Sequence, residues 1–361
     1  MPWAKTVLVE NLNLWGVRRG FIPSPTPWRI LRPLNFFEFV TTRFGFFPEM
    51  LIFSLRALQL LKGNVPGGHF DIIHDVQSLG YGLLLMKRFH RPLVATIHHP
   101  LTIDFQASLE RDRNFTERYY TVVFYPLGMQ RRVARRCDRV LTSSQETARE
   151  IQRAFRVNAD KIRMVYNGLD ADFFRPLDGK PKRLNSLLFV GNTDDSKKGI
   201  FYLLQALTLL PEKVTLIIVD QGAPFKAYAP ELVQKFRLAS RVTFTGKVSP
   251  EALRQLYGSS EIVVLPSLYE GFGLPAAESM ACGTPVIGTR AGALPEVVGE
   301  EGAGILVPTR DPQALAQAIL ELLRDPERRK NMGAAGRRRV EKLFTWERVA
   351  EQTVEVYKEL L

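Results

Sequence analysis

The chain of 361 residues is 45% hydrophobic and 24% charged, which is typical of a globular protein and long enough for two domains. Two distant cysteines, Cys137 and Cys282, exclude a disulfide framework and a cysteine metal site, and since no signal-peptide pattern and no apolar run of ~18 residues occurs, we expect a cytoplasmic protein. The net charge of +12 lies mainly in residues 1–170, which hold 24 Lys and Arg against 14 Asp and Glu, and this excess indicates either an anionic partner or solubility alone.

The first half of the chain contains apolar runs that predict a parallel sheet. We expect its strands at Thr6–Val9, Ile72–His74, Leu93–Ile97, Arg139–Leu141 and Ile162–Val165. Residues Phe36–Leu61 are rich in Phe and Leu, and core packing is favoured over a lipid-facing or acceptor-binding surface. A basic cluster at helical spacing follows, for which a solvated helix face is favoured over an anionic membrane or acceptor: Arg131, Arg132, Arg135, Arg136 and Arg139.

The second half alternates apolar strands with helix patterns. The predicted strands are Leu187–Val190, Val214–Val219, Val242–Phe244, Ile262–Leu265, Pro285–Ile287 and Gly304–Val307, and helices are expected at Gly199–Leu210, Pro250–Tyr257, Pro312–Leu323 and Trp346–Leu361. Fully apolar strands separated by helices indicate a parallel sheet covered on both faces. We therefore expect an α/β protein with two doubly wound domains, residues 1–174 and 184–345, followed by a C-terminal helix, 346–361, that packs back on the first domain.

A glycine-rich turn between a strand and a helix is the most informative stretch, Pro266–Glu278 (PSLYEGFGLPAAE). Its backbone amides can hold phosphate or sugar oxygens, because glycine lets the chain approach a ligand closely. Glu270 lies in the turn and Glu278 in the helix expected to begin near Ala276, and carboxylates are suitable acceptors for vicinal hydroxyl groups.

This stretch resembles the E-x7-E signature of glycosyltransferase family 4. Further matches occur in the same order at Val165–Pro176, Leu187–Gly199, Ala281–Val298 and the C-terminal helix, so the resemblance covers about residues 70–361. It implies the GT-B fold, in which two Rossmann-like domains face across a cleft. It also implies transfer of a hexosyl unit from a UDP- or GDP-sugar with retention of configuration, without a metal ion or another cofactor.

The resemblance assigns roles to individual residues. Glu278 would bind the ribose of the donor and Glu270 the sugar, while Lys198 would neutralise the diphosphate as it leaves. His98 would lie on the acceptor side, with the adjacent His99 as its rival. The catalytic set is thus Glu270, His98 and Lys198. The remaining donor-binding positions implied are Gly191, Asn192, and the backbone of Gly271, Phe272, Gly273 and Leu274.

Two departures from the family pattern stand out. Asn192 occupies a position that usually carries an arginine beside the diphosphate, for which Lys197 or Arg290 would have to compensate. The usual first strand and glycine-rich loop have no evident equivalent in Asn11–Gly20, so we expect a start that is truncated rather than a loop that is replaced.

Other polar residues carry weaker signals. His74 and Asp75 follow a strand, where a structural role is favoured, and Asn167-Gly168 predicts a turn. Glu296 either caps a helix or lines the donor pocket.

The acceptor stays open among glycolipid, polysaccharide and small metabolite, with a peripheral membrane location as one alternative. The rival functions are a nucleotide-sugar-binding protein without transferase activity and a nucleotide-sugar epimerase. No nucleic-acid-binding motif occurs, so we expect no nucleic-acid partner.

Overall fold

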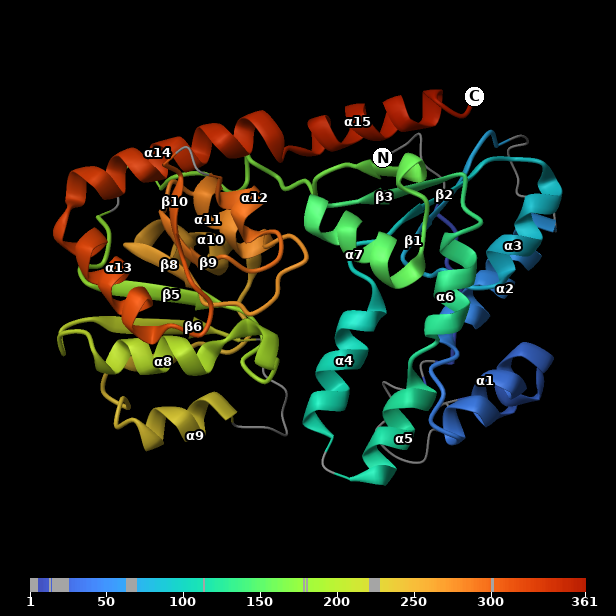
Figure 1. Cartoon of the computed structure of the whole chain (residues 1–361), viewed down its shortest axis with the longest axis horizontal. Helices are drawn as coiled ribbons and strands as arrows, with labels where there is room; N and C mark the ends of the chain where they lie inside the picture. The colour runs from blue at the N-terminus through green and yellow to red at the C-terminus, as the bar shows by residue number, and fades with distance from the viewer. Residues whose placement is uncertain are drawn as a thin grey trace. The chain divides into compact units, whose positions relative to one another are not determined.

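A computed structural model describes residues 6–12, 14, 26–62, 70–112, 114–177, 179, 181–220, 228–299 and 302–361. The chain divides into two compact units, which we call unit 1 and unit 2 (Figure 1). Unit 1 comprises Met1–Thr142, Ala148–Met164 and Glu355–Leu361, and unit 2 comprises Ser143–Thr147 and Val165–Val354.

Unit 1 is built on a four-stranded parallel sheet with the order β1-β2-β3-β4. Its strands are β1 (Ile73–Val76), β2 (Leu93–Thr96), β3 (Arg139–Thr142) and β4 (Ile162–Met164), which confirms four of the five predicted strands. The strand expected at Thr6–Val9 is wrong, because these residues form no strand and the side chains of Val7 and Leu8 are exposed. An apolar run needs both a hydrogen-bonding neighbour and a surface to bury before it becomes a strand.

Several helices surround this sheet. They are α1 (Pro33–Arg43), α2 (Glu49–Lys62), α3 (Gly82–Met86), α4 (Leu101–Arg111), α5 (Phe115–Phe124), α6 (Leu127–Ala134) and α7 (Gln145–Phe155), with short 3₁₀ turns at Pro27–Leu31, Lys87–Phe89 and Ala159–Lys161. The core joins β2 and β3 to α2, α3, α6 and α7. Its centre includes Leu93, Val133 and Ile151, none of which is exposed.

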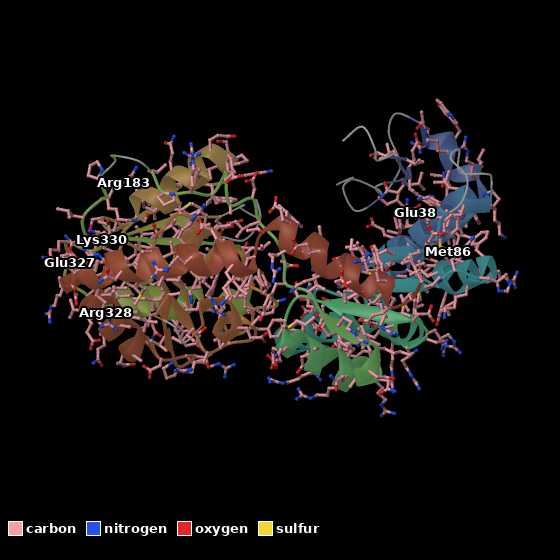
Figure 2. All side chains as sticks on the ribbon, turned by 90° about the horizontal axis from the view of Figure 1, so that it is seen from above. Glu38, Met86, Arg183, Glu327, Arg328 and Lys330 are labelled. Carbon is pink, nitrogen blue, oxygen red and sulfur yellow. The ribbon has the colours of Figure 1, made fainter. Side chains whose placement is uncertain are left out.

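The polarity of helix α1 is inverted. Its buried residues are Asn35, Glu38 and Thr42, a stripe at helical spacing, whereas Phe36 and Phe37 are exposed. Figure 2 labels Glu38 among the helices of unit 1. The buried carboxylate of Glu38 is neutralised by Arg56 of α2, at 2.6 Å, and the same guanidinium donates to Asn35.

Core packing is therefore the wrong prediction for most of the aromatic residues in 36–61. The exposed ones are Phe36, Phe37, Phe44, Phe46 and Phe53. The physical reason is that an ion pair, rather than the aromatic rings, occupies the contact between α1 and α2.

Unit 2 contains a six-stranded parallel sheet with the order β10-β9-β8-β5-β6-β7. Its strands are β5 (Ser186–Val190), β6 (Thr215–Val219), β7 (Val242–Phe244), β8 (Ile262–Leu265), β9 (Val286–Thr289) and β10 (Gly304–Val307), so all six predictions are confirmed within two residues. The chain first builds outward from β5 to β7 and then returns to place β8 on the other side of β5. Ligands of such sheets bind at the carboxyl ends of the strands where the order reverses, here between β5 and β8.

Helices cover both faces of this sheet (Figure 1). Alternate strand residues point to opposite faces: Leu187 belongs to a core with α8 (Ile200–Thr208), α9 (Tyr228–Lys235) and α13 (Pro312–Arg324). Its neighbour Leu188 belongs to a second core. That core is covered by α10 (Pro250–Ser259), α11 (Leu274–Ala281), α12 (Leu294–Val298) and α14 (Pro326–Leu343).

The division into units falls at Met164–Val165, ahead of the expected boundary at 174–184. Tyr166 and Phe174 pack against the second core of unit 2, which draws this segment into it. Lys182 then binds the loop to unit 2 by donating to the Gly258 and Ser260 carbonyls and the Thr284 hydroxyl. The polar, proline-containing stretch is thus a packed loop of unit 2.

The last helix, α15 (Trp346–Lys358), begins in unit 2, and the chain passes into unit 1 at Glu355. In unit 1, Glu359 forms ion pairs with Arg139 and Arg163 at 2.9 and 2.7 Å. These bonds attach the end of the chain to the beginnings of β3 and β4.

Candidate active site

The loop that follows β8 lies at the point where the strand order of unit 2 reverses. It ends at Gly273, the residue before α11, whose φ of +98° is unfavourable for any residue with a side chain. A Cβ at this position would also lie 2.9 Å from Leu294 and 3.3 Å from the Glu270 side chain. Helix α11 begins at Leu274, two residues before the position expected from the sequence.

Backbone contacts fix a second loop, which follows β5, against this one. Gly199 has a φ of +65°, and a Cβ there would lie only 2.0 Å from the Pro266 carbonyl oxygen. The Leu268 N–H donates to the Lys197 carbonyl at 2.7 Å. Lys198 is therefore held beside the glycine-rich turn by main-chain geometry rather than by its flexible side chain.

Lys198 and Glu270 meet in this arrangement. The ammonium group donates to both carboxylate oxygens of Glu270, at 3.1 and 2.8 Å, and both side chains are largely buried. The Ser267 hydroxyl donates to the same carboxylate at 3.3 Å. A cation and an acid that are partly removed from water interact strongly with a charged ligand, because little solvent screens them.

Glu278 is held differently, by a neutral partner. The hydroxyl of Tyr257, which is completely buried, donates to the Glu278 carboxylate at 2.7 Å. Burial raises the pKa of Glu278, and the hydrogen bond from Tyr257 opposes that rise. One carboxylate oxygen is thus fixed by the protein, so the acid enters ligand binding already oriented.

The main-chain amides of the loop are well placed for a ligand. Within the described part of the chain, the N–H groups of Gly271, Phe272 and Gly273 donate to no protein acceptor. The Phe272 side chain is buried and packs against Tyr166 and Phe344, so only its backbone is suitable for binding. Amides beside a helix N-terminus attract anions and hydroxyl oxygens.

The turn after β5 places Gly191 and Asn192 at the same edge of the sheet. A Cβ at Gly191 would lie 3.8 Å from the Lys198 side chain. The Asn192 side chain accepts the Asp194 N–H at 2.9 Å and so builds a local turn. Of the two suggested substitutes for an arginine, Lys197 lies 3.8 Å from Asp195, and Arg290 is exposed just after β9.

In unit 1, a polar corner follows β1 and β2. Gln77, whose φ is +63°, accepts the His98 N–H at 2.6 Å and donates to the His99 carbonyl at 2.7 Å. The His99 ring lies 2.9 Å from the Asp104 carboxylate. A non-glycine residue held at positive φ is often part of a functional site, and here it fixes the backbone of both candidate histidines.

His74 and Asp75 have structural contacts. The two ring nitrogens of His74 lie 2.5 Å from the Tyr357 hydroxyl and 2.7 Å from the Thr96 hydroxyl, and burial lowers the pKa of the imidazole. The Asp75 carboxylate accepts the Leu79 N–H at 2.9 Å. These contacts fit the structural role that the sequence favours for both residues.

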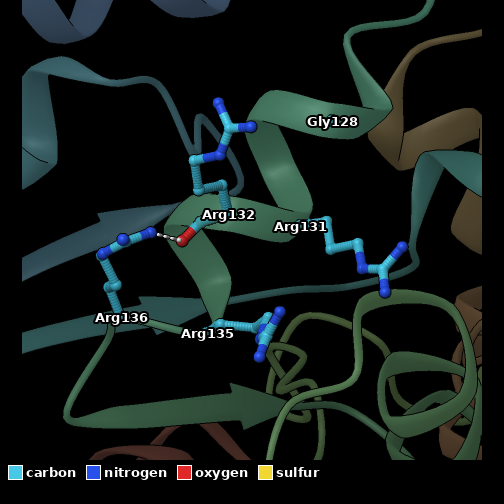
Figure 3. Close-up of a pocket in the computed structure, with 5 residues that line it drawn as sticks. All are labelled: Gly128, Arg131, Arg132, Arg135 and Arg136. Carbon is cyan, nitrogen blue, oxygen red and sulfur yellow. Dashed lines mark hydrogen bonds between the residues drawn. The ribbon is translucent and has the colours of Figure 1, made fainter.

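The basic cluster lies on α6 and the turn after it. A hollow of about 460 Å³ is lined by Gly128, Arg131, Arg132, Arg135 and Arg136 (Figure 3). Figure 3 shows Arg131 and Arg135 extending to the same side, while Arg136 donates to the Arg132 carbonyl. None of these arginines forms an ion pair within the described residues, whereas Arg139 pairs with Glu359.

Metal-ligand clusters and membrane-spanning helices are both lacking in the described part of the chain. It contains no group of three or more His, Cys, Asp or Glu side chains arranged to hold a metal ion. Among the helices that the structure describes, none has both the length and the apolar character needed to cross a bilayer.

Sequence reasoning misses the residues that support this site. Tyr257, Ser267 and Gln77 contact the candidate residues through side-chain bonds between elements distant in the sequence. Gly292 belongs to a segment that resembles the family, but only the structure shows its close approach to Glu270, whose carbonyl oxygen would lie 2.1 Å from a Cβ at position 292. Glu296 caps the start of α7, which is one of its two expected roles.

Two models of known protein families match the chain. A family model described as Glycosyl transferases group 1 matches residues 170–339, and one described as Glycosyltransferase Family 4 matches residues 18–173. The chain is 37% identical over 373 residues to an MMP alpha-(1->4)-mannosyltransferase of Mycolicibacterium hassiacum, covering 100% of this chain and 87% of that protein.

Solved structures share the fold. A sucrose-phosphate synthase from Thermosynechococcus elongatus is similar with a TM-score of 0.72 and 30% identity, over 86% of this chain and 79% of that one. The Anabaena protein HepE, in complex with UDP and glucose, has a TM-score of 0.68 and 21% identity, over 87% of this chain and 83% of its own. The second likeness is one of fold alone.

Proposed function

The chain belongs to glycosyltransferase family 4 and has the GT-B fold, and we propose that it transfers a hexosyl unit from a nucleotide sugar to an acceptor hydroxyl with retention of configuration. The observation that carries this proposal is the bonding of Lys198 to both oxygens of Glu270 where the strand order reverses. This arrangement places a cation and an acid beside a loop of available amides. A leaving diphosphate and a sugar require these groups together.

The donor would lie along the carboxyl ends of β5 and β8. Glu278 would accept hydroxyl hydrogens of the ribose with the oxygen that Tyr257 leaves available. Glu270 and the loop amides of Gly271–Leu274 would contact the sugar and the diphosphate. UDP is a reasonable first donor because HepE is known in complex with UDP and glucose, and a GDP-mannosyl donor is the second because the 37% identical relative is a mannosyltransferase.

In the proposed reaction, the acceptor oxygen forms a bond to the anomeric carbon on the face from which the diphosphate departs. The bond from that carbon to the phosphate oxygen breaks, and the nucleoside diphosphate keeps the electron pair. The acceptor proton passes to a phosphate oxygen on the same face. Lys198 would stabilise the negative charge that develops, which requires neither a metal ion nor a cofactor.

His98 would serve the acceptor side of this reaction. The hydrogen bond from its backbone N–H to Gln77 fixes the main chain just after β2. The position from which the His98 side chain extends is therefore fixed. His99 is the weaker candidate because its ring already lies 2.9 Å from the Asp104 carboxylate.

The experiment that tests the function combines binding and product analysis. Thermal shifts with UDP, GDP, ADP and their sugars would identify the donor, and incubation with glycolipid, oligosaccharide and small-metabolite acceptors would follow. We expect a shift with one nucleotide sugar and a product whose anomeric signal matches that of the donor. Binding without transfer would favour a binding protein, and inversion of a donor centre without an acceptor would favour an epimerase.

A second proposal concerns an anionic membrane surface, and it rests on the inverted polarity of α1. Exposed Phe36 and Phe37 lie outside the buried Glu38–Arg56 pair. Exposed Phe44 and Phe46 flank Gly45, where a Cβ would lie 2.8 Å from Tyr120 of α5. Exposed phenylalanine rings favour the interface of a bilayer when basic side chains lie on the same surface, because the rings enter the acyl boundary while the cations contact the headgroups.

The arginine cluster on α6, which belongs to the same unit, would supply the positive charge. Arg131 and Arg135 form no ion pair within the described residues, and each basic side chain near an acidic membrane contributes about 1 kcal/mol. Sedimentation with phosphatidylcholine vesicles, with and without phosphatidylglycerol, tests the proposal. We expect binding only to the acidic vesicles and loss of it in Phe36→Ser/Phe37→Ser and in Arg131→Ala/Arg135→Ala. Equal binding to both kinds of vesicle, or to neither, would overturn it.

A further inference from the structure

We propose that Ser144, Thr147 and Glu296 are positioning residues that set the direction of the amide groups in the donor loop. We call Ser143–Thr147, which belongs to unit 2, the strap. The inference rests on the proposed function, because it assumes that the loop Gly271–Leu274 holds the donor. It concerns residues that contact this loop on its carbonyl side.

Hydroxyl groups of the strap converge on one carbonyl of the loop. The Ser144 hydroxyl lies 3.1 Å and the Thr147 hydroxyl 3.2 Å from the Gly271 carbonyl oxygen. Both side chains are completely buried. Leaving a buried hydroxyl group without a hydrogen bond costs free energy, so these contacts are a stable part of the folded structure.

Glu296 holds the strap in place. Its two carboxylate oxygens accept the N–H groups of Gln145 and Glu146 at 2.8 and 2.9 Å. These amides are the first of helix α7, where the helix dipole favours a negative charge. Since both oxygens are engaged by the main chain, Glu296 is assigned to the strap and not to the donor.

The carbonyl anchor determines where a neighbouring N–H points. The Gly271 carbonyl and the Phe272 N–H belong to the same planar trans peptide and therefore point in opposite directions. Fixing the carbonyl toward the strap directs the Phe272 N–H to the other side of the loop, where no described residue accepts it. The strap thereby orients a hydrogen-bond donor for a ligand.

The preceding peptide is anchored in the same way. The Glu270 carbonyl accepts the Ala293 N–H at 2.8 Å, which directs the Gly271 N–H away from Ala293. Gly292 makes this approach possible, because a Cβ there would lie 2.1 Å from the Glu270 carbonyl oxygen. Two consecutive amides are therefore set by protein contacts on their carbonyl side, and Glu296 contributes from α12 to only one of them.

If the strap orients the loop amides, its loss should affect the sugar nucleotide and its transfer more than it affects the free nucleoside diphosphate. Amides that contact the sugar or its linkage matter for the sugar nucleotide and for transfer, whereas the nucleoside diphosphate is also held by Lys198 and Glu278. We therefore expect Ser144→Ala/Thr147→Val to lower kcat about 10²-fold, the size of effect that a misplaced transition-state contact produces. The Kd for the free nucleoside diphosphate should change less than threefold.

Controls separate positioning from folding. Ser143→Ala is the matched control, because the buried Ser143 hydroxyl has no hydrogen-bond partner within the described residues. Thr147→Ser keeps the hydroxyl and should restore most of the rate lost in Thr147→Val. Glu296→Gln, which keeps one acceptor oxygen, should fall between the wild type and Glu296→Ala in kcat.

The outcomes are distinguishable from failure of the proposed function. If the wild type neither binds nor turns over a nucleotide sugar, the function itself fails. If the wild type transfers and Ser144→Ala/Thr147→Val is as active, or if it loses nucleotide and sugar-nucleotide affinity equally, the positioning role is overturned. An equal loss of rate in Thr147→Ser and Thr147→Val, with unchanged melting temperatures, would overturn it as well.

Discussion

The carboxyl ends of the two sheets are organised in different ways. In unit 2, glycines at 199, 273 and 292 bring main chains together, and the side chains of Lys198 and Tyr257 fix both candidate acids. In unit 1, the Gln77 side chain bonds to the backbone of both His98 and His99, and the His99 ring lies 2.9 Å from Asp104. The proposed donor loop is thus held largely by close main-chain contacts, which an added side chain would disrupt, whereas the corner of unit 1 is held by side-chain bonds, which single substitutions can remove.

The largest effect is expected at Lys198, in the loop after β5. We expect Lys198→Ala to lower kcat about 10²–10³-fold, the range for loss of one group that stabilises developing charge. Steady-state transfer assays at saturating donor measure the effect. Lys213→Ala, a loss of an exposed lysine elsewhere in unit 2, is the control and should leave kcat unchanged.

Glu278 tests the donor side through affinity rather than rate. Loss of its charged hydrogen bonds in Glu278→Gln should weaken nucleotide binding by about 1.5–3 kcal/mol, measured by calorimetry. The raised pKa of Glu278 makes wild-type affinity fall as pH is lowered through that pKa, because the acceptor becomes protonated. Glu278→Gln should show no such decline over the same range.

The effect of Glu278 on stability has the opposite sign. A carboxyl whose pKa is raised in the folded state binds more protons when folded, so its contribution to stability falls as pH rises from its ordinary value of 4.5 through the folded one. Lowering the pH should therefore weaken donor binding. It should also remove the free-energy cost of burying the charged Glu278 carboxylate.

Tyr257→Phe changes the Glu278 carboxylate through its hydrogen-bond partner. Removing the hydroxyl leaves the Glu278 carboxylate with one bond fewer, which should cost about 1.5–3 kcal/mol in the free energy of unfolding. It should also move the pH midpoint of donor binding upward, because the bond from Tyr257 lowers the pKa of Glu278. An unchanged midpoint would mean that Glu278 does not bind the donor.

Gln77 tests the less constrained corner. Gln77→Leu removes both bonds to the backbone of His98 and His99, and we expect a loss of about tenfold in kcat/KM for the acceptor, since each neutral bond contributes about 0.5–1.5 kcal/mol. Donor affinity should not change. A comparable loss in donor affinity would contradict the separate roles of the two sheet edges.

The smallest effect is expected at Glu359. Arg163 and Arg139 hold the pKa of this carboxyl at about 2, but its side chain is 35% exposed, so solvent screens the pairs. Glu359→Gln should lower stability by only about 0.2–1 kcal/mol, and thermal unfolding at low and high salt measures it. Because the depressed pKa favours the charged form, this contribution is lost as pH falls from about 4.5 toward 2.

The sequence alone predicts much of unit 2 and less of unit 1. All six strands of unit 2 are predicted from apolar runs, because a strand that is buried on both faces has a continuous apolar sequence. In unit 1, the composition of α1 predicts aromatic residues in a core, and only the pairing of Glu38 with Arg56 explains why they lie outside. In α1 the local hydrophobic pattern indicates the face that the structure leaves exposed, because the buried face pairs with an arginine of α2.

By itself, the sequence determined the alternation of strands and helices in unit 2, the glycine turn after β8 and the residue types available there. Only the tertiary structure decided which of these residues meet. Lys198 and Glu270 are 72 positions apart, and Thr147 and Gly271 are 124 apart. Such contacts depend on the order and register of the strands between them, which long-range packing fixes and no local stretch of sequence contains.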